Sequence, residues 1–143
     1  MLTGTSEAAT VNRVVDGDTI IATTEDGDEL RVRILGIDTP ESVHPDEPVE
    51  CYGPEASEWA TSVLDGQTVT LRTDPTQAET DIYDRALRYI ELADGTDYSV
   101  LAAEQGYAEP YIFDGEPVRK HDQIDAAAAE AEADDRGLWG ACR

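Results

Sequence analysis

Two short segments bring together the residue types that could hold a metal ion and act on a phosphate. Residues 16–19 read Asp-Gly-Asp-Thr between two apolar runs, and residues 33–41 read Arg-Ile-Leu-Gly-Ile-Asp-Thr-Pro-Glu at the end of a third run. Carboxylates that interrupt apolar strands are costly unless a partner satisfies them. Carboxylate and carbonyl oxygens suit Ca²⁺ or Mg²⁺, and the planar guanidinium groups of Arg33 and Arg85 suit phosphate. These segments therefore indicate a divalent-cation site beside an anion site.

Each of these residues is ordinary when it is taken alone. The Asp-Gly-Asp segment is typical of a turn, and Arg33 is typical of a surface strand residue. Arg33 and Asp38 also have opposite strand parity, so a regular strand would point them to opposite faces. One shared site requires the chain to bulge or leave the strand between them, and Gly36 is the expected position.

The elements that must position these residues are expected to be strands in the first part of the chain and a mixture of strands and helices in the rest. Alternating apolar residues predict three strands within 10–37, with an Asp-Gly hairpin turn at 26–27, and two more strands over 68–72 and 86–92. Helices are expected over about 53–65, 100–105 and 122–136. This order predicts an α+β fold, a five-stranded OB-type β-barrel with three α-helices. Residues 1–9 are expected to be a flexible N-terminal segment and 10–143 a single domain.

The composition limits the partners of the chain. Its 143 residues carry 10 lysines and arginines against 32 aspartates and glutamates, a formal charge of −22. In ordinary salt this charge opposes nucleic-acid binding, because cations that neutralise phosphates supply most of the affinity. We expect an acidic surface suited to concentrated salt, as in a protein from a halophile. The alternative is a surface that binds cations or basic partners, and any phosphate chemistry must use a local site.

The given sequence shows neither a membrane-spanning run of apolar residues nor the pattern of a secretion signal. No window approaches the ~18 apolar residues of a membrane span, and the first ten residues lack the pattern of a secretion signal. Cys51 and Cys142 allow one disulfide, whose loop of about 90 residues would contribute ~4 kcal/mol in a chain-entropy model. Such a bond implies an oxidising compartment, and two free buried thiols are the alternative. Neither cysteine has the spacing of a zinc ligand.

Taken together, five segments resemble the staphylococcal nuclease (thermonuclease) family. They occur in the family's order and span the chain from about Thr10 to Trp139. The resemblance implies a five-stranded OB barrel with three helices, in agreement with the element order above. It also implies cleavage of single-stranded DNA and RNA with little sequence preference, at the bond to the 5′ oxygen, leaving 3′-phosphate ends. The segments are Val14-Val15-Asp16-Gly17-Asp18-Thr19, Arg33-Ile34-Leu35-Gly36-Ile37-Asp38-Thr39-Pro40-Glu41, Tyr52-Gly53-Pro54-Glu55-Ala56, Thr80-Asp81-Ile82-Tyr83-Asp84-Arg85 and Gly137-Leu138-Trp139.

The resemblance implies a metal ion and a base. Asp18 and Asp38 would bind Ca²⁺ through their carboxylates, and Thr39 would bind it through its backbone carbonyl. Asp16 would lie just behind these ligands. Glu41 would position or deprotonate the attacking water, a role that typically contributes ~10²–10⁴-fold to the rate.

The resemblance also implies a phosphate and nucleotide site. Arg33 and Arg85 would hold the scissile phosphate, and Tyr83 and Tyr111 would line the nucleotide pocket. Stacking on an aromatic ring contributes ~1–3 kcal/mol per base and tolerates any sequence. For Tyr111 and Phe113, a packing contact at the edge of the core is the alternative.

The chain departs from the staphylococcal enzyme at several positions. The segment 42–48 carries acids where that enzyme has lysines, Ile82 stands in place of a lysine, and Phe113 replaces a tyrosine. These changes reduce the expected phosphate contacts outside the catalytic set. A nucleic-acid-binding OB module that has lost catalysis is the main rival function, and a cation-binding structural protein is a third. We expect a monomer without an obligate protein partner, at an extracellular or cell-surface location, with the cytoplasm as the alternative.

Overall fold

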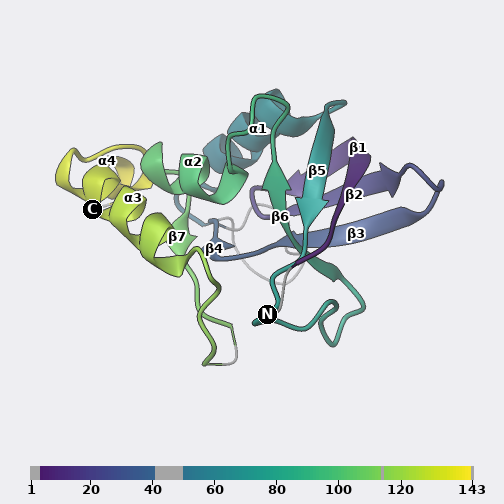
Figure 1. Ribbon diagram of the computed structural model, residues 1–143. Coiled ribbons are helices and arrows are strands. Elements are labelled where there is room, and N and C mark those ends of the chain that lie inside the picture. The colour runs from purple at the N-terminus through teal and green to yellow at the C-terminus, as the bar shows by residue number, and fades with distance from the viewer. Residues whose placement is uncertain (1–3, 41–49, 114, 143) are drawn as a thin grey trace.

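Five strands close into a barrel in the order β1–β2–β3–β6–β5, as Figure 1 shows. The computed structural model describes residues 4–40, 50–113 and 115–142. All neighbouring pairs in the barrel are antiparallel except β3 and β6, which are parallel. The predicted α+β, OB-type barrel is therefore confirmed. Its strands are β1 (Ser6–Asp16), β2 (Thr19–Thr24), β3 (Glu29–Ile34), β5 (Thr68–Arg72) and β6 (Ala86–Glu91).

The first strand begins earlier than its apolar pattern indicates. β1 starts at Ser6, and residues 6–10 pair with β5 in register from Ser6 opposite Arg72 to Thr10 opposite Thr68. Residues 6–9, expected to be part of a flexible segment, are thus part of the barrel. Only Ala8 and Ala9 are apolar in this stretch, so the strand depends on hydrogen bonds to a distant partner that the local sequence does not indicate.

The described residues form four helices beside the barrel, where three were expected. The helices are α1 (Gly53–Leu64), α2 (Tyr98–Glu104), α3 (His121–Ala133) and α4 (Leu138–Ala141), and α2, α3 and α4 pack together at one end of the molecule (Figure 1). The additional helix, α4, is a single turn of four residues. It forms because Gly137, at φ 52°, redirects the chain after α3, and the Leu138 N–H donates to the Gly106 carbonyl at 2.9 Å.

A break after β3 resolves the parity of Arg33 and Asp38. β3 ends at Ile34, and β4 (Ile37–Asp38) leaves the barrel to pair with β7 (Glu109–Pro110) in a separate two-stranded sheet. Gly36 makes the turn at φ +85°, a region that residues with a Cβ rarely adopt. A Cβ at this position would also lie 2.6 Å from Ile124 Cδ1. The predicted break at Gly36 is confirmed.

The core fills the barrel and continues under the helices. Inside the barrel, Ile20, Val32 and Ile90 are fully buried, and Tyr98 of α2 and Ile124 of α3 are fully buried where these helices face the core. A disulfide joins Cys51, just before α1, to Cys142, just after α4, and so ties the start of α1 to the end of α4. None of the described helices is long and apolar enough to cross a membrane.

Candidate active site

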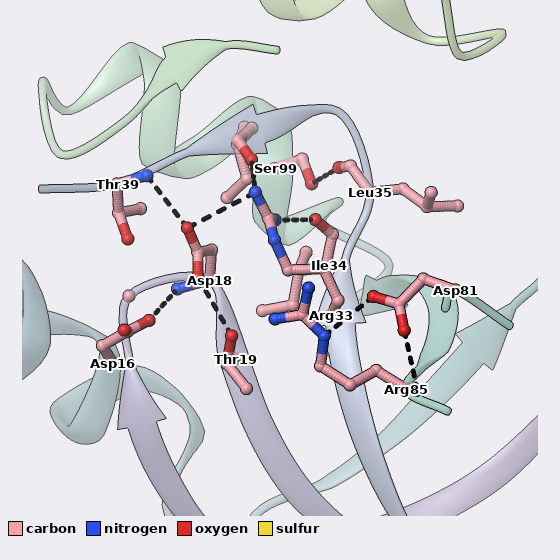
Figure 2. A network of polar contacts seen from close by, with 12 residues as sticks. Asp16, Asp18, Thr19, Arg33, Ile34, Leu35, Thr39, Asp81, Arg85 and Ser99 are labelled. Atoms are coloured by element: carbon pink, nitrogen blue, oxygen red, sulfur yellow. Dashed lines mark hydrogen bonds and ion pairs between the residues drawn. The ribbon is translucent and has the colours of Figure 1, made fainter. Parts of the chain in front are cut away.

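The carboxylate of Asp18 is the buried centre of the site, as Figure 2 shows. Asp18 is 7% exposed, and its Oδ1 accepts a hydrogen bond from the Thr19 hydroxyl at 3.0 Å. Its Oδ2 accepts the Thr39 N–H at 3.1 Å, and its own N–H donates to Asp16 Oδ1 at 3.2 Å. The Asp18 side chain therefore holds the turn between β1 and β2 against the segment that follows β4.

The first residues of α2 hold both this turn and the turn that follows β3. The Tyr98 hydroxyl, fully buried, donates to the Gly17 carbonyl at 2.7 Å, and the Ser99 hydroxyl donates to the Leu35 carbonyl at 2.7 Å. A Cβ at Gly17 would lie 2.8 Å from Thr39, so only glycine permits this approach. Tyr98 and Ser99 are supporting residues that the sequence did not single out, because they face the site only through the tertiary packing of α2.

The guanidinium group of Arg33 lies beside the Asp18 carboxylate. Arg33 Nη2 is 3.5 Å from Asp18 Oδ2 and donates to the Ile37 carbonyl at 2.8 Å, while Nη1 donates to the Ile34 carbonyl at 2.6 Å. Two backbone carbonyls thus hold the fork in one orientation. A guanidinium has five N–H donors, so donors remain for an anion.

Burial and neighbouring groups act on the pKa of Asp18 in opposite directions. Burial raises the pKa of the carboxyl, and the Arg33 charge with the hydrogen bonds from its neighbours lowers it further than burial raises it. The net pKa lies below the ordinary value, so Asp18 is an anion at neutral pH.

A small cavity brings the second arginine to the same place. It has a volume of about 70 Å³, and its lining includes Arg33, Arg85, Asp81 and Tyr111. In Figure 2 the two guanidinium groups lie on the same side of β3. The distant segments around β3 and before β6 therefore meet at one cavity, which both Arg33 and Arg85 line.

Asp81 is the residue that orients Arg85. Its Oδ2 accepts Arg85 Nε at 2.8 Å, and its Oδ1 accepts the backbone N–H groups of Arg85 at 2.9 Å and Tyr83 at 3.0 Å. Burial raises the pKa of Asp81, but these bonds and the Arg85 charge lower it to below the ordinary value. The sequence did not single out Asp81, although its position four residues before a candidate phosphate-binding arginine was the available signal.

Aromatic side chains border the two arginines. The Arg33 Cζ lies 5.5 Å from the Tyr111 ring centre, and the Arg85 Cζ lies 5.4 Å from the Tyr83 ring centre. Tyr83 is 73% exposed, Tyr111 39% and Phe113 42%. Tyr111 and Phe113 are thus covered in part, and their ring centres lie 6.5 Å apart, while Tyr83 is mostly exposed.

The oxygen donors near Asp18 fit a hard divalent cation. Burial raises the pKa of Asp38, and the neighbouring Asp18 carboxylate raises it further. Asp38 also pairs directly with Glu109 across β4 and β7, where like charges oppose each other. The Thr39 hydroxyl is buried and has no hydrogen-bond partner among residues 4–40, 50–113 and 115–142. A bound cation would offset the carboxylate repulsion, and oxygen ligands of this kind suit Ca²⁺.

Not every predicted site residue is placed. Glu41, the candidate base, lies outside the described residues. Within the described residues, no three Asp, Glu, His or Cys side chains gather closely enough to hold a metal ion. Asp18, Asp38 and the Thr39 carbonyl are the candidate ligands that the family resemblance implies.

Comparisons with known proteins agree with this geometry. Residues 31–141 match the family model described as staphylococcal nuclease homologue. The chain is 38% identical over 134 residues to the thermonuclease of Staphylococcus intermedius, covering 93% of this chain and 76% of that protein. It is 36% identical over 130 residues to the thermonuclease of Staphylococcus hyicus, covering 90% and 73%. Endonuclease YhcR of Bacillus subtilis is 31% identical over 136 residues, covering 90% of this chain and 11% of that protein.

Proposed function

Because the chain belongs to the staphylococcal nuclease family and is a nuclease that hydrolyses phosphodiester bonds, we propose that it is calcium-dependent and cleaves single-stranded DNA and RNA with little sequence preference, leaving 3′-phosphate ends. The observation that carries this proposal is the convergence of Arg33 and Arg85 on one cavity beside the buried Asp18 carboxylate.

The two arginines supply most of the electrostatic stabilisation that this chain can offer. A phosphodiester already carries a negative charge, and attack by water adds further charge on the phosphate oxygens. Arg33 is held by two backbone carbonyls and Arg85 by Asp81, so both forks are oriented before the substrate arrives. Groups oriented in advance need little reorganisation as the charge develops, and their contribution is therefore large.

Asp18, Asp38 and the Thr39 carbonyl would hold Ca²⁺. When bound, the ion would offset charge on the phosphate and orient a water. Asp18 suits this role because it is ionised and buried, and its two oxygens retain lone pairs beyond the bonds to Thr19 and Thr39. Glu41 would take the proton of the attacking water, the role that the family resemblance implies and that a carboxylate can fill as a general base.

The exposed aromatic rings would select the substrate. Tyr83 and Tyr111 can stack on unpaired bases, and every base offers a ring face, so stacking requires a single strand but no particular sequence. Stacking also tolerates salt. This fits a chain of charge −22 that works in concentrated salt, where screening over ~3 Å at molar ionic strength removes most repulsion from the substrate. The disulfide supports a location in an oxidising compartment outside the cytoplasm.

Release of acid-soluble nucleotides from denatured DNA tests the proposal. The natural chain, Glu41→Gln and a control, Glu58→Gln, are compared with Ca²⁺ and with a chelator, from dilute buffer to molar KCl. Glu58 makes the same chemical change on the exposed side of α1. We expect Ca²⁺-dependent release by the natural chain and the control, highest at high KCl, and a loss of about 10²–10⁴-fold in Glu41→Gln.

Two outcomes would contradict the proposal. No Ca²⁺-dependent release at any salt concentration would favour a binding module of the same fold. Full activity in Glu41→Gln would remove the role of that residue as the base.

A further inference from the structure

The outer face of the barrel carries a second row of cations beside the row that contains Arg33. The register of β2 and β3 places Thr19 opposite Arg33 and Ile21 opposite Arg31, and the register of β1 and β2 places Arg13 opposite Ile21. Side chains of directly paired residues project from the same face of a sheet. Arg13, Ile21 and Arg31 therefore form one row, which we call the arginine row, next to the row of Thr19 and Arg33.

Burial along the strands places the arginine row outside the barrel. The residues that alternate with it, Ile20 on β2 and Val32 on β3, are fully buried inside. Arg13 and Arg31 are exposed, while Ile21 between them is only 8% exposed. The row is thus a nearly covered isoleucine with an exposed arginine on each side. Its strands, β1, β2 and β3, lie on the other side of the molecule from α3 and α4 (Figure 1).

These two cations are unusual in being free. Neither Arg13 nor Arg31 makes a side-chain hydrogen bond or ion pair in the part of the chain that the structure describes, and among the described cations only Arg119 shares this state. Cations are few in a chain of charge −22, so two unpaired ones in a single cross-strand row beside the candidate phosphate site form a local exception. The other described cations all have partners: Arg33, Arg72, Arg85, Arg88, Lys120 and Arg136.

The spacing of the row suits an extended polyanion. Arg31 and Arg33 are two residues apart on β3, about 6.6–6.8 Å along the strand, and Arg13 lies two strands from Arg31, about 9.4–9.8 Å across the sheet. Long arginine side chains span these distances, which are comparable with the separation of neighbouring phosphates in an extended strand. The next row, with Thr23 opposite Glu29, carries no cation, so the cationic track ends there.

We propose that Arg31 and Arg13 bind backbone phosphates of the substrate strand outside the scissile bond, continuing the track that begins at Arg33. The inference rests on the proposed function for the identity of the substrate. A chain with this net charge repels nucleic acid over most of its surface, so a long strand must be held where cations are local and unpaired. These contacts are independent of sequence and act on binding, because they lie away from the reacting phosphate.

Binding of fluorescein-labelled oligothymidylate in a chelator, where cleavage does not interfere, tests the track over a series of KCl concentrations. The variants are Arg13→Gln, Arg31→Gln and Arg31→Lys. The control is Arg136→Gln, which changes the charge equally at the α2–α4 end. Each glutamine variant in the row is expected to lower the slope of log affinity against log salt by about 0.7 and to weaken binding of a 16-mer several-fold at low salt. Arg31→Lys should keep the natural slope, since a lysine also displaces a counterion.

Cleavage kinetics with Ca²⁺ separate this track from catalysis. For a 16-mer, both glutamine variants should raise KM several-fold with unchanged kcat, and for a trinucleotide too short to reach the row they should match the natural chain. If the natural chain is active and both glutamine variants have the same salt slope and the same KM as the natural chain, the inference is overturned and the proposed function stands. An inactive natural chain whose slope still falls in the variants would overturn the proposed function and retain the track.

Discussion

Replacing Asp81 by asparagine isolates the orientation of Arg85 from its charge. Asparagine keeps an oxygen for the backbone N–H groups of Tyr83 and Arg85, which Asp81 Oδ1 accepts at 3.0 and 2.9 Å. It replaces Oδ2, which accepts Arg85 Nε at 2.8 Å, by an amide that donates. Two donors then face each other, and the guanidinium loses the bond that directs it into the cavity shared with Arg33.

The size of the effect follows from this one bond. A hydrogen bond to a charged group contributes about 1.5–3 kcal/mol, and Asp81 is nearly covered while Arg85 is about a quarter exposed. If the whole loss falls on the transition state, the rate drops about 10- to 150-fold, because each 1.36 kcal/mol is a factor of ten. Removal of a complete transition-state donor costs about 10²–10³-fold, so Asp81→Asn should have a smaller effect than deletion of the Arg85 side chain.

The assay is steady-state cleavage of denatured DNA with Ca²⁺, with kcat and KM reported separately. Asp84→Asn is the matched control, since it makes the same change three residues away at an exposed position with φ 62°, which asparagine tolerates. We expect kcat to fall in Asp81→Asn and to equal that of the natural chain in Asp84→Asn. The two variants and the natural chain should have similar melting temperatures. Equal kcat values in the two folded variants would refute the orienting role of Asp81.

Three further predictions concern stability. Asp74 accepts the Tyr89 hydroxyl at 2.6 Å among other bonds, so Asp74→Asn should lower the free energy of unfolding of the protein by about 1.5–3 kcal/mol. The control is Asp26→Asn, which makes the same change at an exposed turn. Burial raises the pKa of Asp74 but its hydrogen bonds lower it to below the ordinary value, so this stabilisation is complete at neutral pH. The stabilisation is lost as the pH falls below about 4 and through the lowered pKa of Asp74. Urea unfolding at several pH values should therefore show that the difference in free energy of unfolding between the natural chain and Asp74→Asn shrinks at acid pH. A difference that stays constant with pH would contradict this. Replacing Cys51 and Cys142 together by alanine should cost about 4 kcal/mol in the same assay, and a loss below 1 kcal/mol would exclude the loop-entropy account. Raising KCl from millimolar to molar should increase the melting temperature, because salt screens the repulsion within a chain of charge −22, and a flat or falling curve would count against a surface suited to salt.

Much of the fold could be predicted because its signals are local. The Asp-Gly turn at 26–27, the alternating strands and the Pro54 helix start depend on neighbouring residues, and each was found near its predicted place. The start of β1 at Ser6 and the short helix α4 were missed. Both depend on partners far along the chain, β5 for the strand and Gly106 for the turn into α4, and local patterns do not contain such partners.

The candidate site divides in the same way. Residue chemistry made Asp18, Arg33 and Arg85 candidates, the family resemblance selected them, and the opposite parity of Arg33 and Asp38 required a break after β3. The residues that support them could not be predicted from the sequence. Asp81 acts by orienting the Arg85 side chain, and Tyr98 contacts the β1–β2 turn only because α2 packs against it.

The amino-acid sequence by itself determined which charged groups were available and which strands would carry them, since both follow from residue type and short-range periodicity. Only the tertiary structure decided that two arginines from segments some fifty residues apart share one cavity, and that Arg13 and Arg31 line up beside them. The physical reason is that strand register and barrel closure are set by contacts between distant segments, and a shift of one residue would turn each of these side chains to the opposite face.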